Sequence, residues 1–99
     1  DGIINIFCHL PPRLRREVHQ NAAKALAPKG VLLLEAYTPN QLRYNTGGPK
    51  QLHYLYSAAD LQQDFAALKI QHLAEIERDI QEGTGHTGLS SVVQVIAHN

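Results

Sequence analysis

The chain has 99 residues, of which 43% are apolar and 18% charged, and its nine basic and nine acidic side chains leave no formal net charge. This length suits one globular unit, and the balanced charge argues against a nucleic-acid-binding surface. A single cysteine excludes an internal disulfide, and no stretch approaches the ~20 apolar residues of a membrane span or resembles a signal peptide. We therefore expect a cytoplasmic protein.

The first predicted element is a strand from Gly2 to Cys8. Ile3 to Phe7 is a nearly continuous apolar run, typical of a parallel strand covered on both faces in the middle of a sheet. This strand opens a chain that has no initiator Met. We therefore expect residues 1–99 to be a single unit that forms the C-terminal half of a larger α/β domain, without its N-terminal half.

A helix is predicted to follow Pro11 and Pro12, because proline fits a first helical turn, where no backbone donor is needed. The residues predicted to face the core, by their helical spacing, are Leu14, Val18, Ala22, Ala25 and Leu26. The residues expected to face solvent are Arg13, Arg15, Arg16 and His19. Val31 to Tyr37 then reads as a second buried strand, which completes a βαβ unit with a right-handed crossover.

Residues 38–56 show no periodicity and, with Tyr37 just before them, contain all four tyrosines. A connection this long is more often functional than a simple join, which predicts a lid over a site. The alternative is that the tyrosines plug the edge of the core.

Ser57 and Asp60 form a predicted capping box at the start of a second helix, with Tyr56 and Leu61 as its hydrophobic staple. This helix is expected to end near Leu68 and to present Leu61, Phe65 and Leu68 to the core. Both crossovers run in one direction, so right-handed connections place both helices on the same face of the sheet.

From Ile70 the period changes to two, which predicts a half-exposed strand. The residues expected to share one of its faces are Ile70, His72, Ala74 and Ile76. A strand over 90–97 should follow and pair antiparallel with its neighbours, leaving the preceding strand at the edge.

Residues 83–88 match GxGxxG. A dinucleotide site needs a strand before this pattern and a helix after it, whereas here a strand is predicted to follow, so we interpret the match as a turn. Cys8 and His9 point to opposite faces and no further ligands complete a tetrahedral set, so no metal site is expected.

Chemically useful side chains gather at the carboxyl ends of the first two strands, the edge where open α/β sheets bind ligands. This predicted rim contains Phe7, Cys8, His9, Glu35, Tyr37 and His86.

Residues 1–10 and 26–37 resemble the fourth strand, helix and fifth strand of class I S-adenosylmethionine-dependent methyltransferases, including the Leu-x-Pro-x-Gly before the fifth strand. Residues 46–49, 77–79, 82–83, 86–88 and 91–94 look like the small bacterial methyltransferases related to the tellurite-resistance type. The resemblance covers essentially the whole chain.

The resemblance implies a Rossmann-like sheet in which this chain supplies strands four to seven, in spatial order 4-5-7-6 with the last strand antiparallel. The glycine-rich cofactor loop and the acidic ribose ligand of the family are absent. The positions that match the cofactor segment are Ile6, Phe7, Cys8 and His9. His9 and Tyr37 are the candidate bases, although methyl transfer needs mainly alignment. The candidate substrate-binding residues are Tyr37, Tyr44 and His86.

The resulting hypothesis is a fragment of an S-adenosylmethionine-dependent methyltransferase that acts on a small-molecule or unidentified acceptor and is inactive alone. The alternative is a non-catalytic assembly module that forms a homo-oligomer, or pairs with the missing half, through its first strand and bare sheet face. A third interpretation, half of a dinucleotide-binding oxidoreductase, fails if residues 89–97 form a strand.

Overall fold

The computed structural model describes residues 1–44, 46–81 and 87–99, which form one four-stranded sheet and two α-helices. The strands are β1 (Gly2–Ile6), β2 (Val31–Tyr37), β3 (Lys69–Gln81) and β4 (Thr87–His98). The α-helices are α1 (Pro12–Ala25) and α2 (Ala58–Asp64), and the 3-10 helices are η1 (Pro39–Arg43) and η2 (Leu52–Tyr54).

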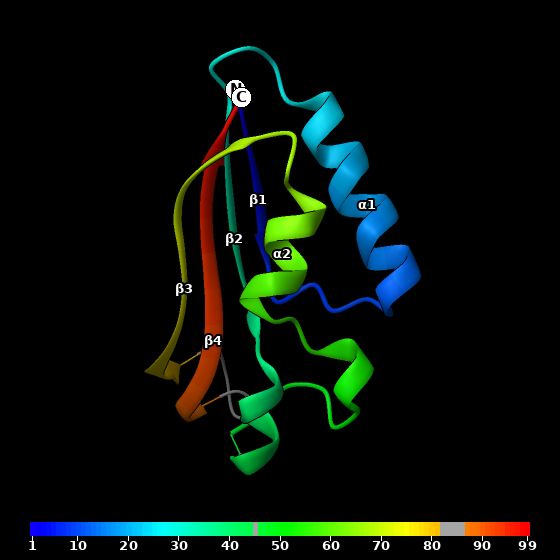
Figure 1. Ribbon diagram of the computed structural model, residues 1–99. Helices are drawn as coiled ribbons and strands as arrows, with labels where there is room; N and C mark the ends of the chain where they lie inside the picture. The colour runs from blue at the N-terminus through cyan, green and yellow to red at the C-terminus, as the bar shows by residue number, and fades with distance from the viewer. Residues whose placement is uncertain (45, 82–86) are drawn as a thin grey trace.

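The sheet has the order β1-β2-β4-β3, with β1 parallel to β2 and β4 antiparallel to both of its neighbours (Figure 1). The last strand therefore lies inside the sheet, and β3 takes the edge opposite β1. This arrangement confirms the mixed α/β class. The described part of β4 forms a strand from Thr87, so residues 89–97 are not helical and the dinucleotide-binding interpretation is excluded.

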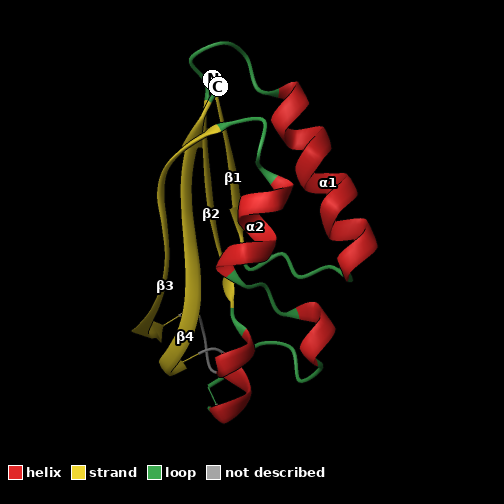
Figure 2. Ribbon diagram, viewed as in Figure 1, coloured by secondary structure: helices red, strands yellow, loops and turns green. Residues whose placement is uncertain are grey.

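Both helices cover the same face of the sheet (Figure 2). Alternate residues of β2 and β4 point into the core beneath the helices, as the period of two requires. The buried residues of this core from the sheet are Leu32, Leu34, Ala36, Val93, Val95 and Ala97. The helical side contributes Ala23, Leu26, Leu61, Phe65 and Leu68, with Tyr56 from the chain just before α2.

The first strand is shorter than predicted, and one of its two faces is exposed. It ends at Ile6 because Phe7 takes a positive φ of 51°, a conformation in which a strand cannot continue. Ile3 packs against the core, but Ile4 is 72% exposed and Ile6 48% exposed on the face without helices. Among the described residues β1 is therefore an edge strand with one bare face, which agrees with the expected exposed first strand and bare sheet face of this chain.

The buried face of α1 matches the predicted one only in part, since Leu26 is buried and Ala22 packs against the core. Leu14 is 44% exposed and Val18 37% exposed, and Ala25 is exposed as well. The helical residues that are buried instead are Arg15, His19 and Ala23. Arg15 and His19 were expected in solvent, but both pair with Asp64 of α2, and these contacts turn α1 away from its most apolar stripe.

In β3 a β-bulge between Ile70 and His72 breaks the period of two. Ile70 therefore packs against the core together with Leu73, whereas His72 is exposed on the bare face. The predicted grouping of Ile70 with His72, Ala74 and Ile76 is thus wrong at its first member.

The capping box at the start of α2 is confirmed. The Ser57 hydroxyl accepts from the Asp60 backbone N–H at 3.1 Å, and the Asp60 carboxylate accepts from the Ser57 N–H at 3.1 Å. The predicted core residues Leu61, Phe65 and Leu68 are buried, but the helix ends at Asp64, one turn earlier than expected.

Replacing Ser57 with alanine is expected to lower the free energy of unfolding by about 1 kcal/mol, because the Asp60 N–H loses its acceptor. Urea denaturation measures this. The control is Gln62→Ala on an exposed position of the same helix, and an equal effect of both variants would contradict the role of the cap.

Candidate functional site

The loop that follows β1 places three of the predicted rim residues beside the end of β2. The Phe7 ring stacks on the Tyr37 ring at a centroid distance of 4.6 Å, and the His9 ring stacks on Tyr37 at 5.5 Å. Tyr37 is fully buried, whereas the Cys8 side chain is exposed. The parallel pairing of β1 with β2 thus brings Phe7, Cys8, His9 and Tyr37 together, as expected from the topology.

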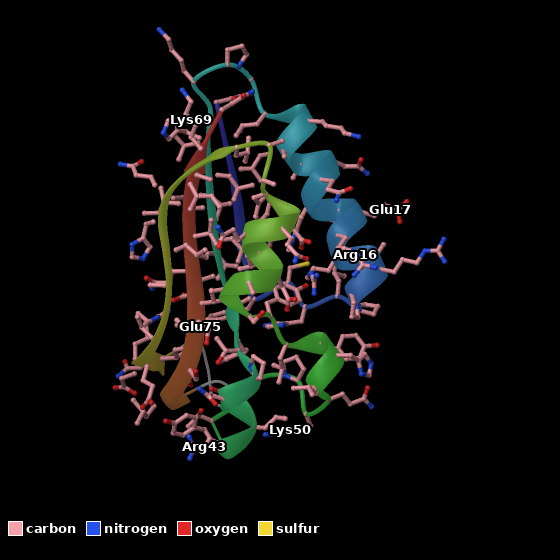
Figure 3. The ribbon with its side chains drawn as sticks, in the orientation of Figure 1. Arg16, Glu17, Arg43, Lys50, Lys69 and Glu75 are labelled. Carbon is pink, nitrogen blue, oxygen red and sulfur yellow. The ribbon has the colours of Figure 1, made fainter. Side chains whose placement is uncertain are left out.

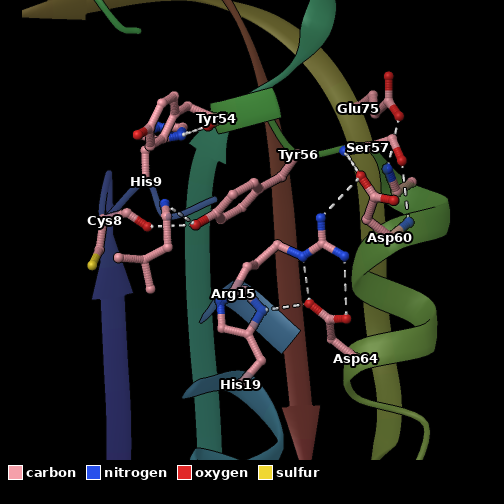
Figure 4. Close-up of polar contacts among 12 residues, drawn as sticks. Cys8, His9, Arg15, His19, Tyr54, Tyr56, Ser57, Asp60, Asp64 and Glu75 are labelled. Atoms are coloured by element: carbon pink, nitrogen blue, oxygen red, sulfur yellow. Dashed lines mark hydrogen bonds and ion pairs between the residues drawn. The ribbon is translucent and has the colours of Figure 1, made fainter. Parts of the chain in front are cut away.

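The His9 ring links this loop to two other segments. Its Nε2 accepts a hydrogen bond from the Tyr37 backbone N–H at 3.2 Å. Its Nδ1 lies 2.7 Å from the Tyr54 carbonyl oxygen, as Figure 4 shows. Because Nε2 accepts a hydrogen bond and Nδ1 faces a carbonyl oxygen, the ring is the neutral tautomer with its proton on Nδ1. His9 therefore joins the β1 loop to β2 and to η2.

Tyr56, which was expected in the helix staple and among the tyrosines of residues 38–56, makes a second link to the same loop. Its hydroxyl donates to the Cys8 carbonyl oxygen at 2.9 Å and accepts from the Leu10 N–H at 2.6 Å. Burial raises the pKa of the Tyr56 hydroxyl to about 12, so it stays protonated and able to donate. The Tyr56 N–H also donates to the Tyr37 carbonyl, which connects the chain before α2 to β2.

The connection between β2 and α2, described for residues 38–44 and 46–56, is held against the sheet both near its start and at its last residue. Tyr37 and Tyr56 are fully buried, and the buried Gln41 side chain accepts from the Ser91 N–H and donates to Thr46 and Gly47. The alternative interpretation, tyrosines that plug the edge of the core, therefore describes Tyr37 and Tyr56 better than a lid does.

Two predicted rim or substrate residues, Tyr44 and Glu35, lie elsewhere. Tyr44 hydrogen-bonds to Glu77 of β3, which raises the pKa of its hydroxyl. Glu35 lies on the bare face with Arg78 and Gln94. Burial would raise the pKa of Glu35, but the hydrogen bonds from these two residues lower it below its ordinary value. His86 lies outside the described residues.

A buried ion-pair network lies between the two helices, and the sequence analysis missed it (Figure 4). Arg15 Nε donates to Asp64 Oδ2 at 2.8 Å, and His19 Nδ1 lies 2.8 Å from the same oxygen. The side chains of Arg15, His19 and Asp64 are 5%, 1% and 0% exposed. Because a carboxylate only accepts, His19 carries a proton on Nδ1, and its buried Nε2 has no hydrogen-bond partner among the described residues.

The ionised form of Asp64 is stabilised by its partners. Burial would raise the pKa of this carboxyl, but the hydrogen bonds from His19 and Arg15 and the positive charge of Arg15 lower it below its ordinary value. A depressed pKa in the folded state contributes stability above the unfolded-state pKa, and this contribution is lost as the pH falls through the folded-state pKa.

We therefore expect the free energy of unfolding to fall as the pH is lowered from 5 towards the folded-state pKa values of Asp64 and Glu35. Denaturation in urea at a series of pH values measures the slope. Asp64→Asn should flatten it, because the amide has no proton to bind. An unchanged slope in this variant would contradict a lowered pKa for Asp64.

Two features are not found in the described part of the chain. No three His, Cys, Asp or Glu side chains among the described residues gather closely enough to hold a metal ion. No helix among them has the length and apolar character to cross a membrane.

Comparisons with known proteins find similar folds among solved structures. No protein-family model matches the chain, and no curated protein matches it. Among solved structures, the N-methyltransferase NodS from Bradyrhizobium japonicum WM9 superposes with a TM-score of 0.63 at 15% sequence identity. The match covers 99% of this chain and 49% of the NodS chain, so this chain spans about half the length of that protein. The fold is therefore similar to part of a methyltransferase fold.

Proposed function

We propose that this chain is part of an S-adenosylmethionine-dependent methyltransferase that acts on a small-molecule acceptor. The observation that carries the proposal is the full-length structural match to half of an N-methyltransferase, together with aromatic side chains gathered at the carboxyl ends of β1 and β2. In this proposal the four strands correspond to strands four to seven of the larger sheet, as the sequence resemblance implies.

The residues at the end of β1 fit one end of the cofactor. Ile6 is 48% exposed, and Phe7 and His9 are partly exposed, which makes an apolar and aromatic wall that suits a sulfonium cation. Ile6, Phe7, Cys8 and His9 would hold the methionine end. The bound cofactor would supply an electrophilic methyl group, while these residues orient it and exclude water.

The two candidate bases differ in access to an acceptor. Tyr37 is fully buried, whereas His9 is partly exposed, so His9 is the better candidate to meet an acceptor. Its Nε2 accepts from the Tyr37 N–H, and it would act as a base only by exchanging this bond for one to the acceptor. Tyr44 and His86 remain candidates for binding the acceptor. We also propose that the chain alone binds S-adenosylmethionine only weakly.

The test is a titration of the ¹⁵N-labelled chain with S-adenosylmethionine, followed by NMR. We expect shift changes at Phe7, Cys8 and His9 that saturate only in the millimolar range. Adenosine, which lacks the methionine end, should leave these three amides unchanged. Absence of shifts at Phe7 to His9 would contradict the cofactor site, and submillimolar binding would contradict the proposal that the main affinity lies outside this chain.

A second candidate function, an assembly module, is favoured by the exposure of β1. Ile4 and Ile6 are exposed on an edge strand. Beside them the bare face has a groove of about 440 Å³, whose lining includes Ile6, Leu33 and His72. Unpaired edges with apolar side chains drive pairing with another strand. Sedimentation should then give a dimer that Ile4→Lys dissociates and Leu14→Lys, at an exposed position of α1, does not. A monomer for the unmodified chain would rule this function out.

A further inference from the structure

We propose that a cleft between α1, η2 and α2 binds a small molecule with an amino group at one end, an anionic group at the other and an apolar body between them. This ligand would be the methyl acceptor, and that assignment rests on the proposed function, whereas the binding itself does not. The cleft measures about 310 Å³, the lower end of the range for small-molecule sites.

The walls of the cleft are part apolar and part polar, and the polar groups come from three elements. The apolar lining is Pro12, Pro39, Leu52 and Leu55. The polar lining is Arg15, Arg16, His53, Ser57 and Asp60. The apolar side chains would hold the apolar body of the ligand, and the polar groups would fix its orientation.

Asp60 supplies the negative end of the cleft. Its Oδ2 accepts from the Ser57 N–H at 3.1 Å and lies 3.5 Å from Arg15 NH1, whereas its Oδ1 has no hydrogen-bond partner among the described residues. The Asp60 side chain is 38% exposed, so a ligand can reach it. A carboxylate oxygen with open lone pairs suits an N–H donor, which an amino group provides.

Arg16 supplies the positive end. It lies in the N-terminal half of α1 and is exposed, and it has no ion-pair partner among the described residues (Figure 3). Arg15 does not play this part, because Asp64 already neutralises it from beneath the cleft. Arg15 lies between two carboxylates, Asp60 and Asp64, so one negative charge remains in excess there, and exposed Arg16 adds a positive charge at the border of the same cleft. Charges of both signs match a zwitterion better than a simple cation or anion.

The cleft adjoins the rim through η2. This short helix contributes Leu52 and His53 to the cleft lining, and the carbonyl oxygen of its last residue, Tyr54, contacts His9. The next residue, Leu55, also lines the cleft. A ligand in the cleft would therefore lie beside the β1 loop to which we assign the methionine end of the cofactor.

The first test compares three probes that share a para-substituted benzene ring, by NMR titration of the chain without cofactor. They are 4-(aminomethyl)benzoate, which carries both charges, 4-methylbenzylamine, which carries the amine only, and 4-methylbenzoate, which carries the carboxylate only. We expect saturable shifts at Arg16, His53 and Asp60 with the first probe, and binding at least about fivefold weaker with the other two, the effect of losing one partly exposed charge contact. Equal binding of all three, or shifts elsewhere, would overturn the proposal.

The second test uses charge-neutral variants. Arg16→Gln should weaken binding of the zwitterion about fivefold and leave the amine probe unchanged, whereas Arg13→Gln, at an exposed position of the same helix, should change neither. Asp60→Asn should weaken binding of both amines, with Asp79→Asn as its exposed control on β3. Asp60 also caps α2, so Asp60→Asn could fail to fold. In that case the comparison of Arg16→Gln with Arg13→Gln tests the proposal alone. If Arg16→Gln binds the zwitterion as tightly as the unmodified chain does, the proposal is overturned.

The two proposals fail in different ways. Loss of zwitterion binding would leave S-adenosylmethionine shifts at Phe7 to His9 intact. Conversely, zwitterion binding without any cofactor shifts would keep the cleft as a binding site and remove the methyltransferase function.

Discussion

Asp64→Ala is expected to lower the free energy of unfolding by about 3 to 5 kcal/mol, the usual cost of removing one partner from a buried ion pair. The substitution removes the closer carboxylate of the buried Arg15 guanidinium, which is 5% exposed and keeps only the 3.5 Å contact to Asp60. It also leaves both nitrogens of the His19 ring without a charged partner. The loss is large because neither side chain can reach water without moving α1. Chemical denaturation of the variant and the unmodified chain measures it.

The control is Gln63→Ala, which truncates an exposed neighbour on the same helix and should have little effect. Domains of this size have about 5 to 15 kcal/mol of stability in total, so Asp64→Ala alone can unfold the chain. The triple variant Arg15→Met, His19→Leu and Asp64→Leu should then recover most of the stability, because it removes every buried charge at once. Failure of the triple variant to recover, or a loss below 1 kcal/mol for Asp64→Ala, would contradict this account.

This network explains why Leu14 and Val18 were wrongly predicted to lie on the buried face of α1. Helical spacing identified the most apolar stripe, which contains Leu14 and Val18, and that stripe is partly exposed. Arg15 and His19 are buried because of Asp64, which lies 49 and 45 positions further along the chain. A pattern read within one helix carries no information about a charged partner at that distance.

The features that were predicted well depend on local signals or on topology. The capping box joins residues three apart, and the βαβ unit follows from two apolar strands flanking a helix. The gathering of Phe7 and His9 against Tyr37 also follows from topology, because parallel neighbours end at the same edge. No sequence pattern indicated the β-bulge after Ile70. Because of this bulge, Ile70 lies on the core face of the sheet and not on the face of His72.

The role of Tyr56 also went unrecognised, because its partners are backbone atoms nearly fifty positions away. Nothing in a sequence says which hydroxyl will satisfy the Cys8 carbonyl and the Leu10 N–H. The one available signal was that the residue before the capping box is a tyrosine and not an aliphatic residue, which offers a polar group at the end of a buried ring.

Tyr56→Phe is expected to cost about 1 to 3 kcal/mol of folding free energy, because the variant keeps the ring and leaves a backbone acceptor at Cys8 and a donor at Leu10 unpaired. The Leu10 amide should also lose protection in hydrogen exchange. Tyr44→Phe is the matched control, since it removes a more exposed hydroxyl on the same connecting segment, and it should have a much smaller effect. If the two variants were equally stable, Tyr56 would fill space only, and the geometry of the β1 loop would depend on His9 alone.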